Sequence, residues 1–222
     1  NMGVGADRLD VIPLGYGSPR TAQPLAPAEL RQRLGLGDGP IVLNVGQKKA
    51  HRNLEGLIDA FAIVRRDVPD AELVLPGPPN EQAEIALLKH AEARGLTGAV
   101  HIPGYVESDE LEGLYKAAAA FVLPSLIEGF GLPVLEAMVR GVPVVAAAAG
   151  SLPEVARPED LVPAEDVAAW AAAIEAVLAE STDARNARIA GGRERAAQFG
   201  PERTAAALLT AYRRAAAARV PT

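Results

Sequence analysis

The most constraining feature of the sequence is residues 124–136, P-S-L-I-E-G-F-G-L-P-V-L-E, which directly follow the apolar run 117–123. The apolar run is typical of a buried strand, and Pro133 suits the first turn of a helix, where its missing N–H group costs no hydrogen bond. A glycine-rich turn between a strand and a helix directs several backbone N–H groups, and the positive end of the helix dipole, at one point. The segment therefore predicts a binding site for a phosphate or another anion.

Two carboxylates bracket this turn. Glu128 lies in the turn and Glu136 in the first turn of the expected helix, with seven residues between them. An ionised carboxylate accepts hydrogen bonds but donates none, so it pairs well with the two hydroxyl donors of a vicinal diol. A ligand with sugar hydroxyls at both ends and a pyrophosphate between them would satisfy the whole arrangement. A nucleotide-sugar has this chemistry.

Short apolar runs alternate with longer segments of helical periodicity along the chain. We expect strands at 7–17, 41–45, 71–75, 99–102, 117–123, 142–146 and 161–162. We expect helices at 27–34, after a capping Asn53, at 81–94, after a capping Ser108, from Pro133 to near Gly141, and from Pro153. From Glu165 onward the pattern is helical, with breaks near Thr182 and at Gly200. This order predicts an α/β fold, a doubly wound parallel sheet with helices on both faces, followed by C-terminal helices.

In such a sheet, ligands bind beyond the carboxyl ends of the strands. The turns that carry glycines and charges all follow expected strands, at 46–52, 76–79, 104–106 and 125–132. We therefore expect them to line one crevice. A solvated loop is the ordinary interpretation of Lys48, Lys49 and Arg52, but their position after a strand favours one phosphate contact among them.

The composition narrows the class of protein. The 222 residues are 49% hydrophobic and 23% charged, which is typical of a soluble globular protein with one core. A net charge of -6, an aromatic content of 4% and the lack of a dense basic run argue against nucleic acid as a partner. There is no cysteine, so disulfides and thiolate chemistry are excluded.

The sequence contains no run that could span a bilayer and no signal peptide. We expect a cytoplasmic protein, while peripheral membrane association of a longer protein stays open. Because the chain begins with Asn1 rather than Met, we also expect a fragment or a processed chain.

Several common catalytic motifs are absent. No G-x-G-x-x-G follows a strand, and neither G-x-x-x-x-G-K-[ST] nor G-x-S-x-G occurs, which argues against dinucleotide oxidoreductases, P-loop NTPases and serine hydrolases. The three histidines are scattered, so the sequence predicts no metal site. We expect no cofactor beyond the substrate itself.

The segment 128–136, followed by Ala137-Met138 and by G-V-P-V-V at 141–145, resembles the signature of retaining glycosyltransferases of family 4, which have the two-domain GT-B fold. Residues 45–61, a glycine-ended strand, a basic loop and a helix, resemble the second hallmark of that family. Shorter segments fall where the family pattern places them, at 11–15, 101–104, 115–125 and 151–154. The resemblance covers most of the chain, from Asp7 to the last helices.

The resemblance implies that this chain is the C-terminal half of such an enzyme and binds a nucleoside-diphosphate sugar. A missing N-terminal half would hold the acceptor, and the sugar would be transferred with retention of anomeric configuration. On this basis we expect residues 1–26 to be a remnant of the interdomain linker and the first strand. Residues 27–200 would form the nucleotide-sugar-binding domain, and 201–222 a C-terminal helix that packs on the absent domain.

The same resemblance implies roles around the glycine-rich turn. Glu128 resembles the glutamate that contacts the hydroxyls of the donor sugar, and Glu136 resembles the one that holds the ribose diol. Backbone amides of the turn would meet the sugar and the diphosphate, at Gly129, Phe130, Gly131 and Leu132. The side chain of Phe130 fits core packing equally well.

Further roles fall on two other turns. Arg52 occupies the place of the family's phosphate-binding lysine, and Gly46 ends the preceding strand. The family often has an arginine after that glycine, whereas this chain has Gln47, so Lys48 or Lys49 would supply the lost charge. The main chain of Tyr105 or Val106 would meet the base.

Cleavage of the sugar–diphosphate bond builds negative charge on the departing phosphate, which fixed cations and backbone N–H groups stabilise. We therefore expect Glu128, Arg52 and Lys48 to be the catalytic residues, with the two glutamates positioning the donor rather than acting as an acid/base pair. Two other functions remain open, a sugar-nucleotide epimerase of the GT-B fold and a non-catalytic nucleotide-sugar-binding module.

Overall fold

The computed structural model describes residues 5, 9–16 and 22–217. Within them one sheet of six parallel strands has the order β3-β2-β1-β4-β5-β6. The strands are β1 (Ile41–Leu43), β2 (Glu72–Val74), β3 (Val100–His101), β4 (Ala118–Leu123), β5 (Val144–Ala147) and β6 (Leu161–Val162). The chain adds strands outward from β1 to β3, then returns to place β4 on the other side of β1. The predicted doubly wound parallel sheet is confirmed.

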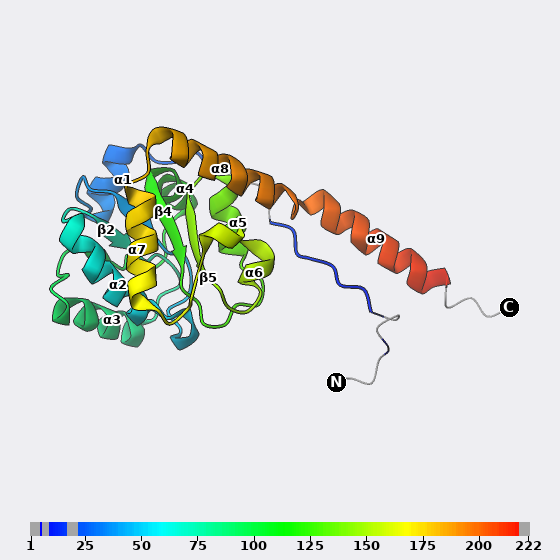
Figure 1. Cartoon of the computed structure of the whole chain (residues 1–222), viewed down its shortest axis with the longest axis horizontal. Helices are drawn as coiled ribbons and strands as arrows, with labels where there is room; N and C mark the ends of the chain where they lie inside the picture. Colours follow the sequence, from blue (N-terminus) through cyan, green and yellow to red (C-terminus); the bar gives the residue numbers. More distant parts are fainter. Residues whose placement is uncertain (1–4, 6–8, 17–21, 218–222) are drawn as a thin grey trace.

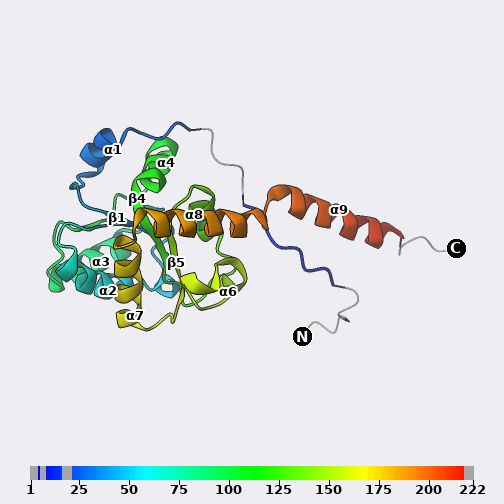
Figure 2. The ribbon, with the colours of Figure 1, turned by 45° about the horizontal axis from the view of Figure 1, so that its top comes forward.

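Helices cover both faces of the sheet (Figures 1 and 2). Helices α2, α3 and α7 lie on one face, and α1 and α4 lie on the other. The helices described are α1 (Pro27–Leu34), α2 (Leu54–Asp67), α3 (Glu81–Ala93), α4 (Ser108–Ala117), α5 (Leu132–Val139), α6 (Leu152–Val155), α7 (Val167–Leu178), α8 (Thr182–Ala197) and α9 (Pro201–Ala217), with short 3-10 turns η2 (Ala50–Arg52) and η3 (Pro158–Asp160). None of the helices described is both long and apolar enough to cross a membrane.

The centre of the sheet is buried on both faces. Every residue of β1, β2 and β5 is buried, as expected for parallel strands that helices cover on both sides. The buried residue Asn44 comes directly after β1. Its backbone N–H group donates to the Val74 carbonyl at 3.0 Å, and its side-chain Nδ2 donates to the Val122 carbonyl at 2.8 Å. Asn44 therefore joins the carboxyl ends of β2, β1 and β4.

The strand expected at 7–17 is wrong over the part that the structure describes. Residues 9–16 have no regular secondary structure and run beside α9, away from the sheet (Figure 1). The N–H group of Tyr16 donates to the Phe199 carbonyl at 3.1 Å, Thr204 Oγ1 donates to the Pro13 carbonyl at 3.0 Å, and Arg214 binds Asp10 at 2.6 Å. The segment contains apolar residues, but within the described chain no strand lies beside it with which it could form backbone hydrogen bonds of a sheet. Residues 7, 8 and 17 lie outside the described part.

The two expected helix caps also differ. Asn53 has a left-handed backbone with φ of 52°, and its side chain donates to the Ala164 carbonyl at 3.0 Å instead of capping α2. The 3-10 turn η2 precedes it and turns the chain into the helix. At α4 the cap position is Glu107, whose N–H group donates to Glu110 at 2.9 Å, so Ser108 becomes the first helical residue.

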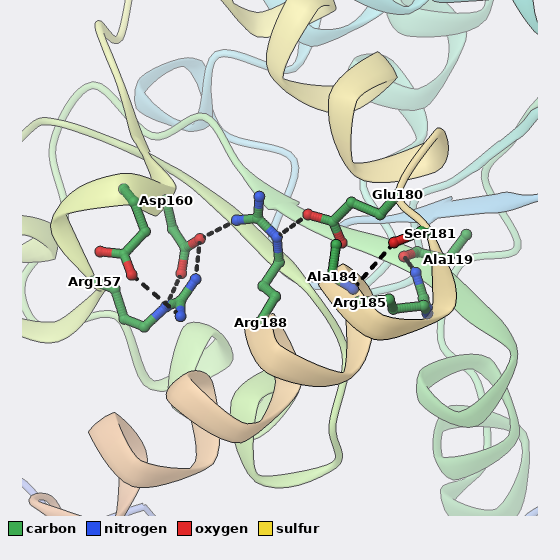
Figure 3. A network of polar contacts seen from close by, with 9 residues as sticks. Ala119, Arg157, Asp160, Glu180, Ser181, Ala184, Arg185 and Arg188 are labelled. Carbon is green, nitrogen blue, oxygen red and sulfur yellow. Dashed lines mark hydrogen bonds and ion pairs between the residues drawn. The ribbon is translucent and has the colours of Figure 1, made fainter.

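A buried carboxylate fixes α8 across the domain (Figure 3). Asp160 is 3% exposed and accepts hydrogen bonds from Arg157 Nε and Nη2 at 2.8 and 2.9 Å. Arg188 of α8 also pairs with Asp160, and its Nε contacts Glu180 at 2.5 Å. One turn earlier, Arg185 Nη1 donates to the Ala119 carbonyl in β4 at 2.8 Å. Helix α8 is thus held against the sheet by polar contacts.

We predict that Asp160→Ala lowers the free energy of unfolding by about 3 kcal/mol, because it leaves Arg157 and Arg188 without their shared buried carboxylate. Urea unfolding followed by circular dichroism measures the loss. The matched control is Glu159→Ala, which removes a partner of the same Arg157 at 3.2 Å whose side chain is 59% exposed, and should cost less than about 1 kcal/mol. Equal losses in the two variants would contradict a structural role for Asp160.

Candidate functional site

The strand order reverses between β1 and β4, so the expected binding site would lie at the edge of the sheet beyond the carboxyl ends of these two strands. Three neighbouring turns interlock there. The N–H group of Gly46 donates to the Pro76 carbonyl at 3.1 Å, and that of Gly77 donates to the Gly104 carbonyl at 2.8 Å. A Cβ atom on Gly77 would lie 2.0 Å from the Gly46 carbonyl oxygen, so only glycine allows this approach. The turns after β1, β2 and β3 therefore form one continuous rim.

The glycine-rich turn leads directly into α5. Gly131 precedes the helix with φ of 99°, in the region that favours glycine, and α5 begins at Leu132. The turn after β5 supports it from the side: the carbonyl of Glu128 accepts from the N–H group of Ser151 at 3.2 Å and from its hydroxyl at 3.0 Å. Gly129 is exposed, and a Cβ atom there would meet nothing within 4 Å. The predicted strand, turn and helix start are confirmed, and Gly129 faces open space.

The structure brings together Arg52 and Glu128, two of the residues selected from the sequence. Arg52 Nη1 makes a short ion pair with Glu128 Oε2, and their side chains are 18% and 12% exposed. The buried hydroxyl of Ser125 lies between them, 3.3 Å from Arg52 Nη1 and 3.4 Å from Glu128 Oε2. Arg52 Nε is buried without a partner in the described part of the chain. The pair joins the turns after β1 and β4.

Ser125 is a residue that sequence reasoning missed as part of this site. Its only signal is position: it is the second residue after the strand β4 and lies three before Glu128. A lone serine in a loop is too common to be selected on that basis.

Glu136 was expected in the first turn of its helix, but α5 begins at Leu132, so Glu136 lies in the second turn. It contacts a residue that sequence reasoning also missed. The Tyr115 hydroxyl donates to Glu136 Oε2 at 3.1 Å. Tyr115 is 1% exposed, and burial, followed by the neighbouring Glu136 carboxylate, raises its pKa well above the usual 10.0. The phenol therefore stays protonated, and remains a hydrogen-bond donor, throughout the neutral range.

Lys48 makes no hydrogen bond or ion pair with Arg52 or Glu128 within the described residues. Its side chain is 1% exposed, and Nζ donates to the Gly77 carbonyl at 3.2 Å and lies 3.7 Å from Glu84 Oε1. Lys48 thus links the turn after β1 to the turn after β2 and to α3. Its neighbour Lys49 is exposed. The ligand contacts predicted for both lysines stay predictions.

The other predicted residues lie on the rim or beneath it. Tyr105 is 66% exposed, whereas Val106 is buried. The ring of Phe130 packs edge-on against Phe199, with centroids 5.9 Å apart, which supports the core-packing interpretation of its side chain. The described residues include no group of three or more His, Asp or Glu side chains that could hold a metal ion.

The buried lysine gives a pH-dependent prediction. Burial lowers the pKa of the Lys48 ammonium from its usual 10.5, and Glu84 offsets this only in part. Just below pH 10.5 the unfolded chain keeps a proton that the folded chain has lost, so the stability of the wild type relative to Lys48→Met should rise with pH in this window. Urea unfolding at pH 7 to 10 measures it, with Lys89→Met on the exposed face of α3 as the control for net charge. A relative stability that falls with pH would contradict the effect of burial.

Comparisons with known proteins identify relatives of the whole domain. The family described as "Glycosyl transferases group 1" matches residues 28–195. A D-inositol 3-phosphate glycosyltransferase of Xylanimonas cellulosilytica is 35% identical over 227 residues, which cover 96% of this chain and 53% of that protein. The chain thus spans about half the length of this curated relative.

Solved structures agree. The sucrose-phosphate synthase of Thermosynechococcus elongatus superposes with a TM-score of 0.76 at 35% identity, over 93% of this chain and 52% of that one. An Anabaena protein, HepE, solved in complex with UDP and glucose, superposes with a TM-score of 0.68 at 23% identity, over 86% of this chain and 51% of that one, which supports the fold. The fold is therefore one Rossmann-like half of a GT-B structure, and the chain belongs to the group 1 glycosyltransferase family.

Proposed function

We propose that this chain is the donor-binding, C-terminal half of a retaining glycosyltransferase of family 4. The whole enzyme would transfer a sugar from a nucleoside-diphosphate sugar to an acceptor held by an N-terminal half. The observation that carries the proposal is the Arg52–Glu128 pair at the switch point of the sheet, beside the start of α5. The HepE structure, which holds UDP and glucose, supports a nucleotide-sugar as the donor.

The pair suits a ligand that has phosphate next to sugar. A guanidinium carries five N–H donors, and the contacts with Glu128 and Ser125 use only Nη1 of Arg52, while Nη2 makes no hydrogen bond within the described chain. Arg52 can therefore hold Glu128 and still offer donors to a diphosphate. In this role it stabilises the negative charge that grows on the leaving phosphate. Glu128, whose carboxylate only accepts, would orient the hydroxyls of the sugar.

The helix start adds a second source of positive potential. The N–H groups of Phe130, Gly131 and Leu132 lead into α5, whose dipole favours an anion at this end. We place the diphosphate between this helix start and Arg52, with Gly46 and Lys49 on the β1 side. Glu136, one turn into α5, would hold the ribose diol, and the main chain of Tyr105 or Val106 would contact the base. Retention of configuration rests on the family resemblance.

Lys48 would support the site without contacting the donor. Because its Nζ is engaged with Gly77 and Glu84, it holds the turns after β1 and β2 together and so sets the shape of the rim. Arg52 and the backbone N–H groups then supply the positive charge that the reaction needs, and the proposal invokes no metal.

The proposed domain division places residues 27–200 around the donor and gives the final helix to the other half. Helix α9 has no buried residue, and it exposes Leu208, Leu209 and Tyr212 by 37%, 53% and 68%. We propose that α9, with residues 9–16 beside it, packs against the N-terminal half of the complete enzyme, which is consistent with the half-length match to the curated relative.

We predict that Arg52→Ala weakens binding of UDP and of UDP-glucose about equally, by roughly tenfold or more, since charge-assisted hydrogen bonds contribute about 1.5–3 kcal/mol. Glu128→Gln should weaken UDP-glucose more than UDP, because only the sugar would contact Glu128. Isothermal titration calorimetry measures both, with GDP and GDP-mannose titrated in parallel because the base is open. Arg66→Ala, an exposed arginine of α2, is the matched control for loss of one positive charge. Unchanged binding in Arg52→Ala would refute the proposed site.

We also predict that this chain binds donor but does not turn it over, because closure of two domains normally completes such a site. Incubation with UDP-glucose or GDP-mannose, followed by chromatography of the nucleotides, measures free diphosphate and any epimerised donor. Efficient transfer by this chain alone would contradict the division into halves. Epimerised donor formed without acceptor would instead favour the epimerase.

A further inference from the structure

The hydrogen bond between Tyr115 and Glu136 joins two helices below the crevice. Tyr115 belongs to the last turn of α4 and Glu136 to the second turn of α5. The hydroxyl of Tyr115 donates to Glu136 Oε2 at 3.1 Å. Glu136 is partly exposed, whereas Tyr115 is 1% exposed. A fully buried phenol thus holds one oxygen of a carboxylate that still reaches solvent.

The ring of Tyr115 itself contacts two further side chains, Arg140 and Phe121. The guanidinium of Arg140 lies 4.7 Å from its centroid, and the ring of Phe121 stacks at 6.0 Å. Arg140 is fixed in turn by two contacts with Glu112, at 2.6 and 2.8 Å, and donates to the backbone carbonyl of Glu136 at 3.0 Å. A cation held in this way over a buried ring leaves the phenol little freedom to rotate or to move.

The general geometry of a helix also gives a direction to the side chain of Glu136. Helix α5 begins at the crevice, and Glu136 lies four residues later, about 6 Å along the helix axis. Side chains in a helix lean toward its N-terminus, so the carboxylate of Glu136 leans back toward the crevice. A carboxylate offers about four acceptor positions, and the Tyr115 hydroxyl occupies one of them. Enough remain for the two hydroxyls of a diol.

We propose that Tyr115 is a positioning residue that sets the orientation of Glu136 and thereby the selectivity of the site for ribose over deoxyribose. The inference rests on the proposed function, in which Glu136 holds the ribose diol. A free carboxylate rotates among several orientations, and each ribose contact would then cost the entropy of fixing it. Tyr115 fixes it in advance, so the 2′-hydroxyl gains more from the contact.

The experiment measures selectivity rather than affinity alone. Binding of UDP and of 2′-deoxy-UDP, and of GDP and 2′-deoxy-GDP, is titrated by calorimetry against the wild type, Tyr115→Phe and Glu136→Ala. Tyr115→Phe removes only the hydroxyl and keeps the ring between Arg140 and Phe121. Tyr212→Phe, which removes a hydroxyl from the exposed face of α9, is the matched control. Tyr115→Met is the second variant if the phenylalanine variant proves insoluble, and thermal melts confirm folding.

We expect the wild type to favour the ribonucleotide about tenfold or more, Glu136→Ala to bind both nucleotides alike, and Tyr115→Phe to lose at least threefold of the preference, mainly through weaker ribonucleotide binding. A purely structural role would weaken both nucleotides equally and leave the preference intact. If Glu136→Ala abolishes the preference while Tyr115→Phe keeps it, the inference about Tyr115 is wrong and the proposed ribose contact stands. If the wild type shows no preference, or Glu136→Ala retains it, the ribose contact itself is wrong and the role of Tyr115 falls with it.

Discussion

The structure depends on the parallel pairing of β1 with β4, two strands that are far apart in sequence. This pairing reverses the strand order and brings the turns that follow the strands of both halves of the sheet to one edge. Asn44 secures the junction, since its buried side-chain amide donates to the Val122 carbonyl of β4 and its backbone N–H group donates to the Val74 carbonyl of β2. A buried amide without such partners would cost stability, so the junction is specified as well as stabilised. The turns that carry Arg52 and Glu128 meet because of this one crossing.

The charged side chains around the candidate site form two separate pairs. Arg52 and Glu128 pair across the junction, with Ser125 between them, and keep some access to solvent. Lys48 and Glu84 lie further along the β1–β2 side, where the ammonium is buried and meets a backbone carbonyl as well. Proximity in sequence does not decide between these environments, because Lys48 and Arg52 are only four residues apart. Arg52 is the last residue of the 3-10 turn η2 and pairs with Glu128 at the junction, whereas Lys48 precedes that turn and contacts Glu84 of α3.

Much of the fold follows from the sequence, because buried parallel strands read as short apolar runs and the helices show clear amphipathic periodicity. Helix α1, the start of α5 and strand β6 were predicted where the structure has them. The irregular conformation of residues 9–16 was not predicted, because an apolar segment next to Pro13 has the pattern of a strand whether or not another strand exists to pair with it. The Asn53 cap failed because its backbone is left-handed and its amide serves the distant Ala164. Spacing found Glu128 and Glu136, but it could not find Tyr115, whose contact with Glu136 depends on how α4 and α5 pack.

The contacts between residues 9–16 and α9 have a mechanical consequence. They run from Tyr16 with Phe199, just before the helix, to Asp10 with Arg214 near its end. Two segments fastened at several points resist torsion far better than a single linker. Phe199 lies before α9 and packs against Phe130 of the glycine-rich turn, so residues 9–16 bridge the break between α8 and α9. Residues 9–16 therefore brace α9 against the domain, and a change in the angle between α8 and α9 would have to disturb these contacts.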